Sequence, residues 1–242
     1  ATCGGRVILV QDENEYIFRN RPGGKEHLEF LRDLMRRLGV NVPIVVCNFF
    51  YERIAGTREC WNCWDGADTG IEALRRVQPD TPKLITEFWC GWFDGWKHDP
   101  ECVRSPRDVH ANSLRVLAHG GMYSYYMFHG GTNFGYFPGR TVGDDYMYMT
   151  SSYDYDAPLP ETAAIGEKYY AAKLASTFAS NLGGVFVESE PADLKVVASD
   201  DVEIITRRGP EGHIIFVFRR TPKVKSARLI LPGAAAIDVS FA

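Results

Sequence analysis

The chain has 242 residues, of which 45% are hydrophobic, 13% aromatic and 24% charged, a composition typical of folded globular domains and not of disordered or fibrous chains. Its 27 basic and 31 acidic residues give a formal net charge of −4 with no long run of one sign, which argues against a nucleic-acid partner held by a basic patch. No stretch approaches ~18 consecutive apolar residues, so the sequence predicts no membrane-spanning helix.

Both ends of the chain lie inside patterns typical of strands. The first residues contain neither Met nor a signal core and lead directly into the apolar run 7–10, and the last residues, 237–242, alternate as a strand does. We therefore expect the chain to be a piece of a longer protein, whose compartment this sequence leaves open.

Short apolar runs alternate with helical patterns over the first 180 or so residues. The expected strands are 7–11, 43–47, 60–64, 83–86 and 122–127. The expected helices are 25–38, 69–77, 106–119 and 161–179, the third opened by a capping box with proline at its first position. Between the last strand and the last helix, a Gly- and Tyr-rich loop covers 128–159, and long loops of this kind are usually functional. Strand–helix alternation predicts an α/β fold with a parallel sheet.

The pattern changes at about Gly183. Short apolar runs separated by Gly, Pro and charged turns follow at 185–187, 194–197, 202–206, 213–218 and 227–231. No helical pattern intervenes, which predicts an antiparallel β domain. We place the α/β part at residues 1–182 and the start of an incomplete β-sandwich domain at 183–242.

Six cysteines are present, and two of them, Cys60 and Cys63, form a C-x-x-C motif. Such a motif can be half of a zinc site or a redox pair. A zinc site would need a second pair of cysteines or a spaced pair of histidines, and neither is present. The acidic cluster at 12–15 does not match an EF-hand loop. The sequence thus favours ordinary buried cysteines and predicts neither a metal nor a cofactor.

Two carboxylates are singled out by their positions. Glu15 follows the first strand, and Glu87 directly follows the strand 83–86. In a β/α barrel the carboxyl ends of the strands form the face on which catalytic groups gather, so the two side chains can share the barrel mouth. A pair of carboxylates, one neutral and one ionised, is what glycoside cleavage requires.

Aromatic residues are dense around the second carboxylate, as expected of a sugar site. Trp89, Trp92, Phe93 and Trp96 follow Glu87, and sugar rings pack their C–H faces on aromatic planes. Each feature also has a plainer interpretation. An acidic residue at a strand end is often a helix cap or a solvated loop group, and a Trp-rich segment is often core.

Four segments in order resemble glycoside hydrolase family 35, the β-galactosidases. They are VILVQDENEY at 7–16, ITEFWCGWFDGW at 85–96, YMFHGGTNFG at 126–135 and SYDYDAPL at 152–159. They are similar to the family's strand-four motif, nucleophile strand, strand-eight motif and following loop. Together they cover about residues 5–170, and four ordered motifs are far more specific than any single residue.

The resemblance implies a role for each matching residue. Glu15 is similar to the family's general acid/base, and Glu87 to its nucleophile. Asn14 matches an asparagine that hydrogen-bonds the sugar 2-hydroxyl, and Tyr126 and Tyr155 match tyrosines that line the galactose pocket. A tyrosine hydroxyl near the nucleophile is expected to donate to it and keep it ionised. The implied activity is that of a retaining exo-β-galactosidase acting on a β-galactoside oligosaccharide or glycoconjugate.

The resemblance also implies missing chain. The five expected strands match strands four to eight of a (β/α)8 TIM barrel, so the fold class is a partial barrel of the C-terminal five β/α units followed by the incomplete β domain. A barrel must close to satisfy its edges. We therefore expect the parent chain to supply the N-terminal barrel half, and this chain alone to be poorly stable and weakly active or inactive.

Three other interpretations stay open. A close relative with the same chemistry could prefer β-glucosaminides, because part of the sugar selectivity lies in the missing strands. A non-catalytic carbohydrate-binding protein on a degenerate barrel would need neither a proton donor nor a nucleophile. A metal or redox protein would be centred on Cys60 and Cys63.

Overall fold

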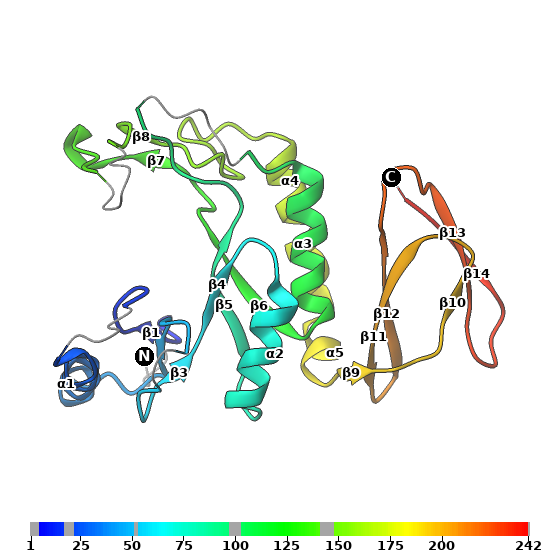
Figure 1. Cartoon of the computed structure of the whole chain (residues 1–242), viewed down its shortest axis with the longest axis horizontal. Helices are drawn as coiled ribbons and strands as arrows, with labels where there is room; N and C mark the ends of the chain where they lie inside the picture. The colour runs from blue at the N-terminus through cyan, green and yellow to red at the C-terminus, as the bar shows by residue number, and fades with distance from the viewer. Residues whose placement is uncertain (1–4, 17–21, 51–52, 97–102, 141–147, 242) are drawn as a thin grey trace. The chain divides into compact units, whose positions relative to one another are not determined.

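The computed structural model describes residues 5–16, 22–50, 53–96, 103–140 and 148–241 (Figure 1). The chain is mixed α/β and forms two compact units. The first comprises Ala1–Val103 and Gly121–Ala164, and the second comprises Arg104–Gly120 and Ile165–Ala242.

The first unit is built on parallel strands (Figure 1). One sheet has the order β1-β2-β3 and the other the order β4-β5-β6, and every pairing within them is parallel. The strands are β1 (Val10–Gln11), β2 (Ile44–Val46), β3 (Arg58–Glu59), β4 (Trp61–Cys63), β5 (Lys83–Trp89) and β6 (Gly121–Tyr126). The predicted α/β class and parallel pairing are thus confirmed.

One residue, Cys60, separates β3 from β4, and its amide donates to the Val46 carbonyl at 2.8 Å. Residues 58–63 therefore act as a single extended segment, which pairs with β2 through its first half and with β5 through its second. Five parallel segments follow one another in chain order. The core between them includes Val45, Cys47 and Cys60, with Leu9 and Leu84 packed against it.

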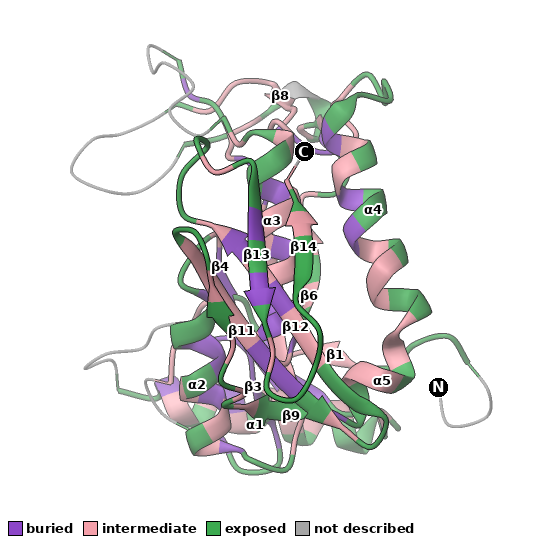
Figure 2. Ribbon diagram, turned by 90° about the vertical axis from the view of Figure 1, so that its right-hand side faces the viewer, coloured by how far each residue is buried: buried purple, intermediate pink, exposed green. Residues whose placement is uncertain are grey.

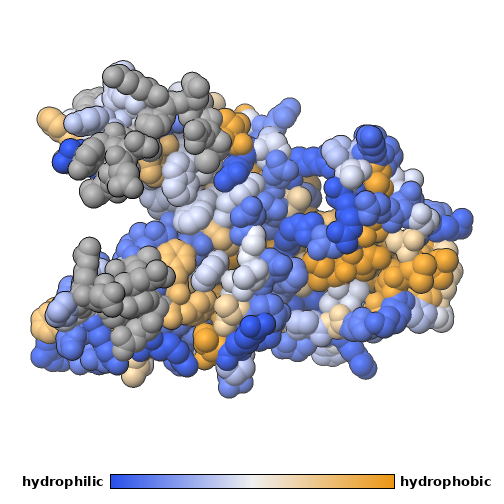
Figure 3. All heavy atoms as spheres, viewed as in Figure 1, coloured by the Kyte–Doolittle hydropathy of each residue, from blue (hydrophilic) through white to orange (hydrophobic). Residues whose placement is uncertain are grey.

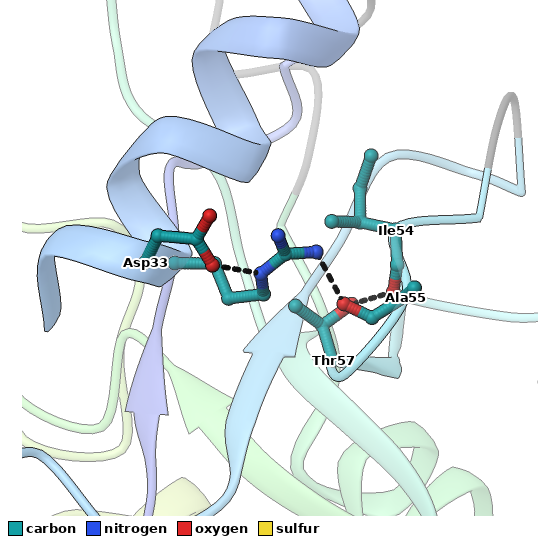
Figure 4. A network of polar contacts seen from close by, with 5 residues as sticks. Asp33, Ile54, Ala55 and Thr57 are labelled. Atoms are coloured by element: carbon teal, nitrogen blue, oxygen red, sulfur yellow. Dashed lines mark hydrogen bonds and ion pairs between the residues drawn. The ribbon is translucent and has the colours of Figure 1, made fainter. Parts of the chain in front are cut away.

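Helices α1 (Gly24–Arg37) and α2 (Ala67–Val77) belong to the same unit. On α1, Leu28 is buried against Ile54. Arg32 donates through Nε to Asp33 at 2.8 Å and through Nη1 to the Ala55 carbonyl at 2.6 Å, which ties the helix to the turn before β3 (Figure 4). That turn is closed by the Thr57 hydroxyl, which donates to the Ile54 carbonyl at 2.8 Å.

The long loop after β6 contains two short strands and a 3-10 turn. Strands β7 (Gly131–Thr132) and β8 (Ser152–Tyr153) pair antiparallel, and η1 (Phe134–Tyr136) lies between them in the chain. The loop continues beyond the expected helix start at 161, and α4 begins at 167 (Glu167–Asn181). The reason is local: the Glu161 amide donates to Asp154 at 2.8 Å and its carboxylate accepts from Ser152 at 2.5 Å, so Glu161 belongs to the loop.

The second unit combines helices with antiparallel strands. Helix α3 (Pro106–Ala118) opens with the predicted capping box, in which the Asp108 amide donates to Ser105 Oγ at 3.1 Å. The strands form two sheets, in the orders β12-β11-β9 and β10-β13-β14. Their bounds are β9 (Glu190–Ala192), β10 (Val197–Ala198), β11 (Val202–Gly209), β12 (Gly212–Arg219), β13 (Ser226–Ile230) and β14 (Ile237–Ser240).

The core of the second unit includes Phe216 and Phe218 on β12 and Ala227 and Leu229 on β13, all buried. Burial alternates along β13, as expected of a strand with one covered face (Figure 2). Apolar side chains gather over these C-terminal strands (Figure 3). The placement of the domain boundary between residues 182 and 183 stays a prediction.

One predicted strand is wrong, and of another, 194–197, only Val197 lies in a strand, β10. Residues 185–187 lie in a short helix, α5 (Gly183–Val187), and the sequence analysis missed β9 directly after it. The Phe186 amide donates to the Leu182 carbonyl at 2.9 Å, and the Phe186 ring stacks on Phe216 with centroids 6.1 Å apart. A three-residue apolar run cannot distinguish a strand from one helical turn, and here ring packing within the unit decides.

Among the described residues, no helix is both long and apolar enough to cross a membrane.

Candidate active site

Glu15 lies in a tight turn that follows β1. Glu13 and Glu15 both have left-handed backbone conformations, with φ of 54° and 49°, which non-glycine residues adopt at a cost of about 1–3 kcal/mol where the surrounding structure imposes it. The surrounding contacts are specific. Gln11 Nε2 donates to the Glu13 carbonyl at 2.9 Å and to Asn14 Oδ1 at 3.1 Å. The Glu13 side chain pairs with His27 at 2.7 Å, and Glu15 is half-buried.

Asn62, a residue that the sequence did not single out, links the Glu15 side chain to the backbone of Glu87. It lies on β4 and is only 2% exposed. Its Nδ2 donates to Glu15 Oε1 at 2.8 Å, and its Oδ1 accepts from the Glu87 amide at 2.9 Å and from Thr86 Oγ1 at 2.8 Å. The structure therefore brings Glu15 and Glu87 to the same place, as the motif positions predicted.

Glu87 lies within β5, and its carboxylate accepts a hydrogen bond from a tryptophan side chain. The donor is Trp89 Nε1, at 2.9 Å from Glu87 Oε2. Burial raises the pKa of Glu87 and the negative charge of Glu15 adds to the increase, while the bond from Trp89 and the nearby Asn14 side chain oppose it.

Donation from a tyrosine to Glu87 stays a prediction. In this structure the Tyr126 hydroxyl bonds that of Tyr153 at 3.2 Å. The tyrosines also pack on one another: the ring centroids of Tyr126 and Tyr155 are 5.4 Å apart, and those of Tyr153 and Tyr155 are 5.5 Å apart. The indole of Trp89 donates to the Glu87 carboxylate.

One aromatic wall near Glu87 consists of Trp89, Trp92, Tyr126, Tyr153 and Tyr155. Trp92 contacts both Trp89 and Tyr155, with centroid distances of 5.2 and 6.0 Å. Burial raises the pKa values of Tyr153 and Tyr155, and the charge of Glu87 adds to both increases. Tyr126 is half-buried, whereas Tyr155 is only 2% exposed. Tyr155 thus serves chiefly as packing behind Tyr126 and Tyr153.

The backbone of the segment that carries Tyr153 and Tyr155 packs closely against the chain just after β5. A Cβ atom added at Gly91 would lie 1.7 Å from the Tyr155 carbonyl oxygen. A Cβ atom added at Gly130 would likewise lie 2.1 Å from the Asp154 carbonyl oxygen. The segment that carries Tyr153 and Tyr155 therefore requires glycine at both positions.

The cysteines do not form a thiolate or metal centre among the residues described here. Cys47, Cys60, Cys63 and Cys90 are free and buried, and Cys3 and Cys102 lie outside the described residues. Burial raises the pKa values of Cys60 and Cys63 to about 12, so these thiols stay protonated at neutral pH and lack redox reactivity. The described part of the chain has no group of three or more His, Cys, Asp or Glu side chains that could hold a metal ion.

Comparison with known proteins gives the family. Residues 1–178 match the family described as "Glycosyl hydrolases family 35", and the chain belongs to this family. It is 34% identical over 184 residues to "Beta-galactosidase-1-like protein 3" of Rattus norvegicus, an alignment that covers 73% of this chain and 28% of the relative.

Two further relatives give the same result. The chain is 35% identical to "Beta-galactosidase" of Felis catus over 69% of its length and 26% of the relative. It is 34% identical to "Beta-galactosidase 10" of Arabidopsis thaliana over 66% of its length and 20% of the relative. The chain thus spans between 20% and 28% of the length of these relatives.

Proposed function

We propose that the protein carrying this chain is a glycoside hydrolase that cleaves terminal β-D-galactosides with retention of configuration. The observation that carries the proposal is the Asn62 amide, which hydrogen-bonds both the Glu15 side chain and the Glu87 backbone. Family membership and the β-galactosidase names of the relatives support the substrate class.

In the proposed mechanism Glu15 is the general acid/base and Glu87 the nucleophile. Glu87 attacks the anomeric carbon while the C1–O bond to the aglycone breaks and Glu15 gives its proton to the departing oxygen. The galactosyl ester on Glu87 is then hydrolysed by a water that Glu15, now a carboxylate, deprotonates.

We assign sugar contacts to Asn14 and Tyr126, and a supporting place in the sugar pocket to Tyr155. A galactose whose C1 lies over Glu87 brings its 2-hydroxyl within reach of Asn14, whose side chain lies near Glu87. Tyr126 is half-buried and offers its hydroxyl to a ligand more readily than the buried Tyr155. Tyr155 contributes by supporting the aromatic wall.

We also propose that the five parallel segments are five consecutive strands of a (β/α)8 barrel, to which the rest of the protein contributes three. Parallel pairing in chain order supports this, as does the family assignment. The antiparallel strands β9–β14 would then begin a β-sandwich domain.

The test is hydrolysis of p-nitrophenyl β-D-galactoside by the protein that carries this chain, followed by NMR of the anomer first released. Glu15→Gln and Glu87→Gln should each lower kcat/KM by about 10²-fold or more. A 2-deoxy-2-fluoro galactoside with a good leaving group should label Glu87 covalently. Glu13→Gln is the matched control, because this neighbouring carboxylate pairs with His27 instead.

Other outcomes point to the alternatives. Hydrolysis of the β-glucosaminide in place of the galactoside would keep the mechanism and change the sugar. Binding of galactose without turnover would indicate a carbohydrate-binding protein. Full activity in both glutamine variants, or a product of inverted configuration, would overturn the proposal.

A further inference from the structure

We propose that Asn62 is a positioning residue that fixes which oxygen of Glu15 carries the catalytic proton. The inference rests on the proposed function, because it assigns Asn62 a role only if Glu15 is the general acid. It is carried by three hydrogen bonds to one buried amide.

The orientation of the Asn62 amide follows from its partners. The Glu87 backbone N–H can only donate, so the atom it faces at 2.9 Å must be the amide oxygen. The Thr86 hydroxyl donates to the same oxygen at 2.8 Å. The amide nitrogen therefore points to Glu15, and a flipped amide would place two donors against each other at Glu87.

The local backbone explains why the Glu87 amide is available to a side chain. The register of β4 against β5 shifts between Trp61 and Asn62, and that of β5 against β6 shifts between Ile85 and Phe88. Irregularities of this kind redirect side chains and recur beside active sites. Here the two register shifts flank Glu87, and Asn62 Oδ1 accepts the hydrogen bond from the Glu87 backbone N–H.

This orientation of the Asn62 amide makes the two carboxyl oxygens of Glu15 inequivalent. Asn62 Nδ2 has no lone pair to offer, so Glu15 Oε1 must present a lone pair to it at 2.8 Å. In the neutral acid the carbonyl oxygen is a better acceptor than the hydroxyl oxygen, so this bond favours Oε1 as the carbonyl and the proton on Oε2, the oxygen left for the glycosidic oxygen of the substrate. Because Asn62 is 2% exposed, water has little access to replace it when the side chain is removed.

This predicts a dependence on the leaving group. Without Asn62 the acid loses its fixed orientation, which matters only when the departing oxygen needs a proton. Asn62→Ala should lower kcat/KM for methyl β-D-galactoside by about 10- to 100-fold. For 2,4-dinitrophenyl β-D-galactoside, whose leaving group departs without a proton, kcat/KM should change by less than about threefold.

The experiment measures both substrates with the protein that carries this chain, alongside Glu15→Gln as reference and Cys63→Ala as matched control. Cys63 is a buried neighbour with a free thiol on the same strand, so Cys63→Ala should leave the ratio of the two rates unchanged. Circular dichroism confirms folding. If Asn62→Ala does not fold, Thr86→Val decides, because it removes one anchor of the amide: it should show a weaker form of the same dependence, which Thr86→Ser restores.

The outcomes separate the two proposals. If Glu15→Gln shows the leaving-group dependence and the Asn62 and Thr86 variants lose both activities equally, Asn62 has only a structural role and this inference is wrong while the function stands. If Glu15→Gln shows no such dependence, the acid assignment fails and the inference fails with it.

Discussion

Glu59 is a buried carboxyl group outside the candidate site, on β3. It is only 3% exposed, and neither of its carboxylate oxygens has a hydrogen-bond partner. Its backbone is well held, since Gln78 bonds both the amide and the carbonyl, at 3.0 and 2.8 Å. Burial raises the pKa of Glu59 to about 7, because the ionised form loses its hydration, and the positive charge of Arg53 opposes this increase only in part.

This residue should make stability depend on pH. A carboxyl group whose pKa is higher in the folded state than in the unfolded state, about 4.3, favours folding fully below pH 4 or so, and this contribution is lost as the pH rises through about 7. Glu59→Gln should therefore be more stable than the natural chain at pH 8, by about 1–3 kcal/mol, with a smaller difference at pH 5.

Urea unfolding at the two pH values measures this difference. Glu211→Gln, a change at an exposed position in the turn between β11 and β12, is the control and should alter neither curve by more than about 0.5 kcal/mol. A stability difference for Glu59→Gln that is the same at pH 5 and pH 8 would contradict the argument.

At the scale of elements, α3 illustrates how a local signal fixes a boundary. Ser105 Oγ accepts from the Asp108 amide at 3.1 Å and donates to the Asp108 carboxylate at 2.6 Å, and Pro106 occupies the first turn. These contacts satisfy an amide that the helix itself cannot. The helix starts where the capping box predicts because the signal needs only four consecutive residues.

Removing the N-cap of α3 should lower the stability of the protein measurably. Ser105→Ala should lower the free energy of unfolding by about 1 kcal/mol, whereas Ser105→Asn, which keeps an acceptor, should lower it by only a few tenths. Chemical denaturation of the two variants checks this. Equal losses would show that the hydroxyl is not the group that matters.

The contact between the end of β5 and the tyrosine segment is a second relation between elements. Gly91→Ala would drive a methyl group into the Tyr155 carbonyl, so the segment must move. We expect a stability loss of about 1–3 kcal/mol and a rise in KM for galactosides as the aromatic wall shifts. Gly131→Ala is the control, since a Cβ there meets nothing within 4 Å and should change neither quantity.

At the scale of the whole molecule, the parallel segments leave apolar side chains incompletely covered. Leu9 and Leu84 pack against the buried core but are only partly buried themselves, and Val7 and Ile8 are 56% and 77% exposed. An apolar surface of this kind beside an open parallel sheet calls for a covering layer.

We therefore expect the 242-residue chain, expressed alone, to hydrolyse p-nitrophenyl β-D-galactoside far more slowly than the protein that carries it, by about 10²-fold or more. The reason is that the proposed barrel needs three further strands to fix its mouth. Clear turnover by the isolated chain, abolished by Glu15→Gln, would refute this expectation.

The sequence by itself determined the elements whose signals are local. Five strand segments, four helices and the cap of α3 were predictable from periodicity and turn residues. The proximity of Glu15 and Glu87 was also predictable, although Glu87 lies within β5 and not after a strand that ends at residue 86. The short apolar run 185–187 was not predictable, since a helical turn and a strand bury three such residues equally well.

Only the tertiary structure decided what those residues touch. Asn62 lies inside a motif that suggested cysteine chemistry, yet its amide bonds Glu15 and Glu87, which are far from it in the chain. Likewise, Trp89 donates to Glu87 while the tyrosines pack on one another. Hydrogen bonds depend on distances of a few tenths of an ångström between separate strands. Register shifts set those distances, and no local pattern encodes them.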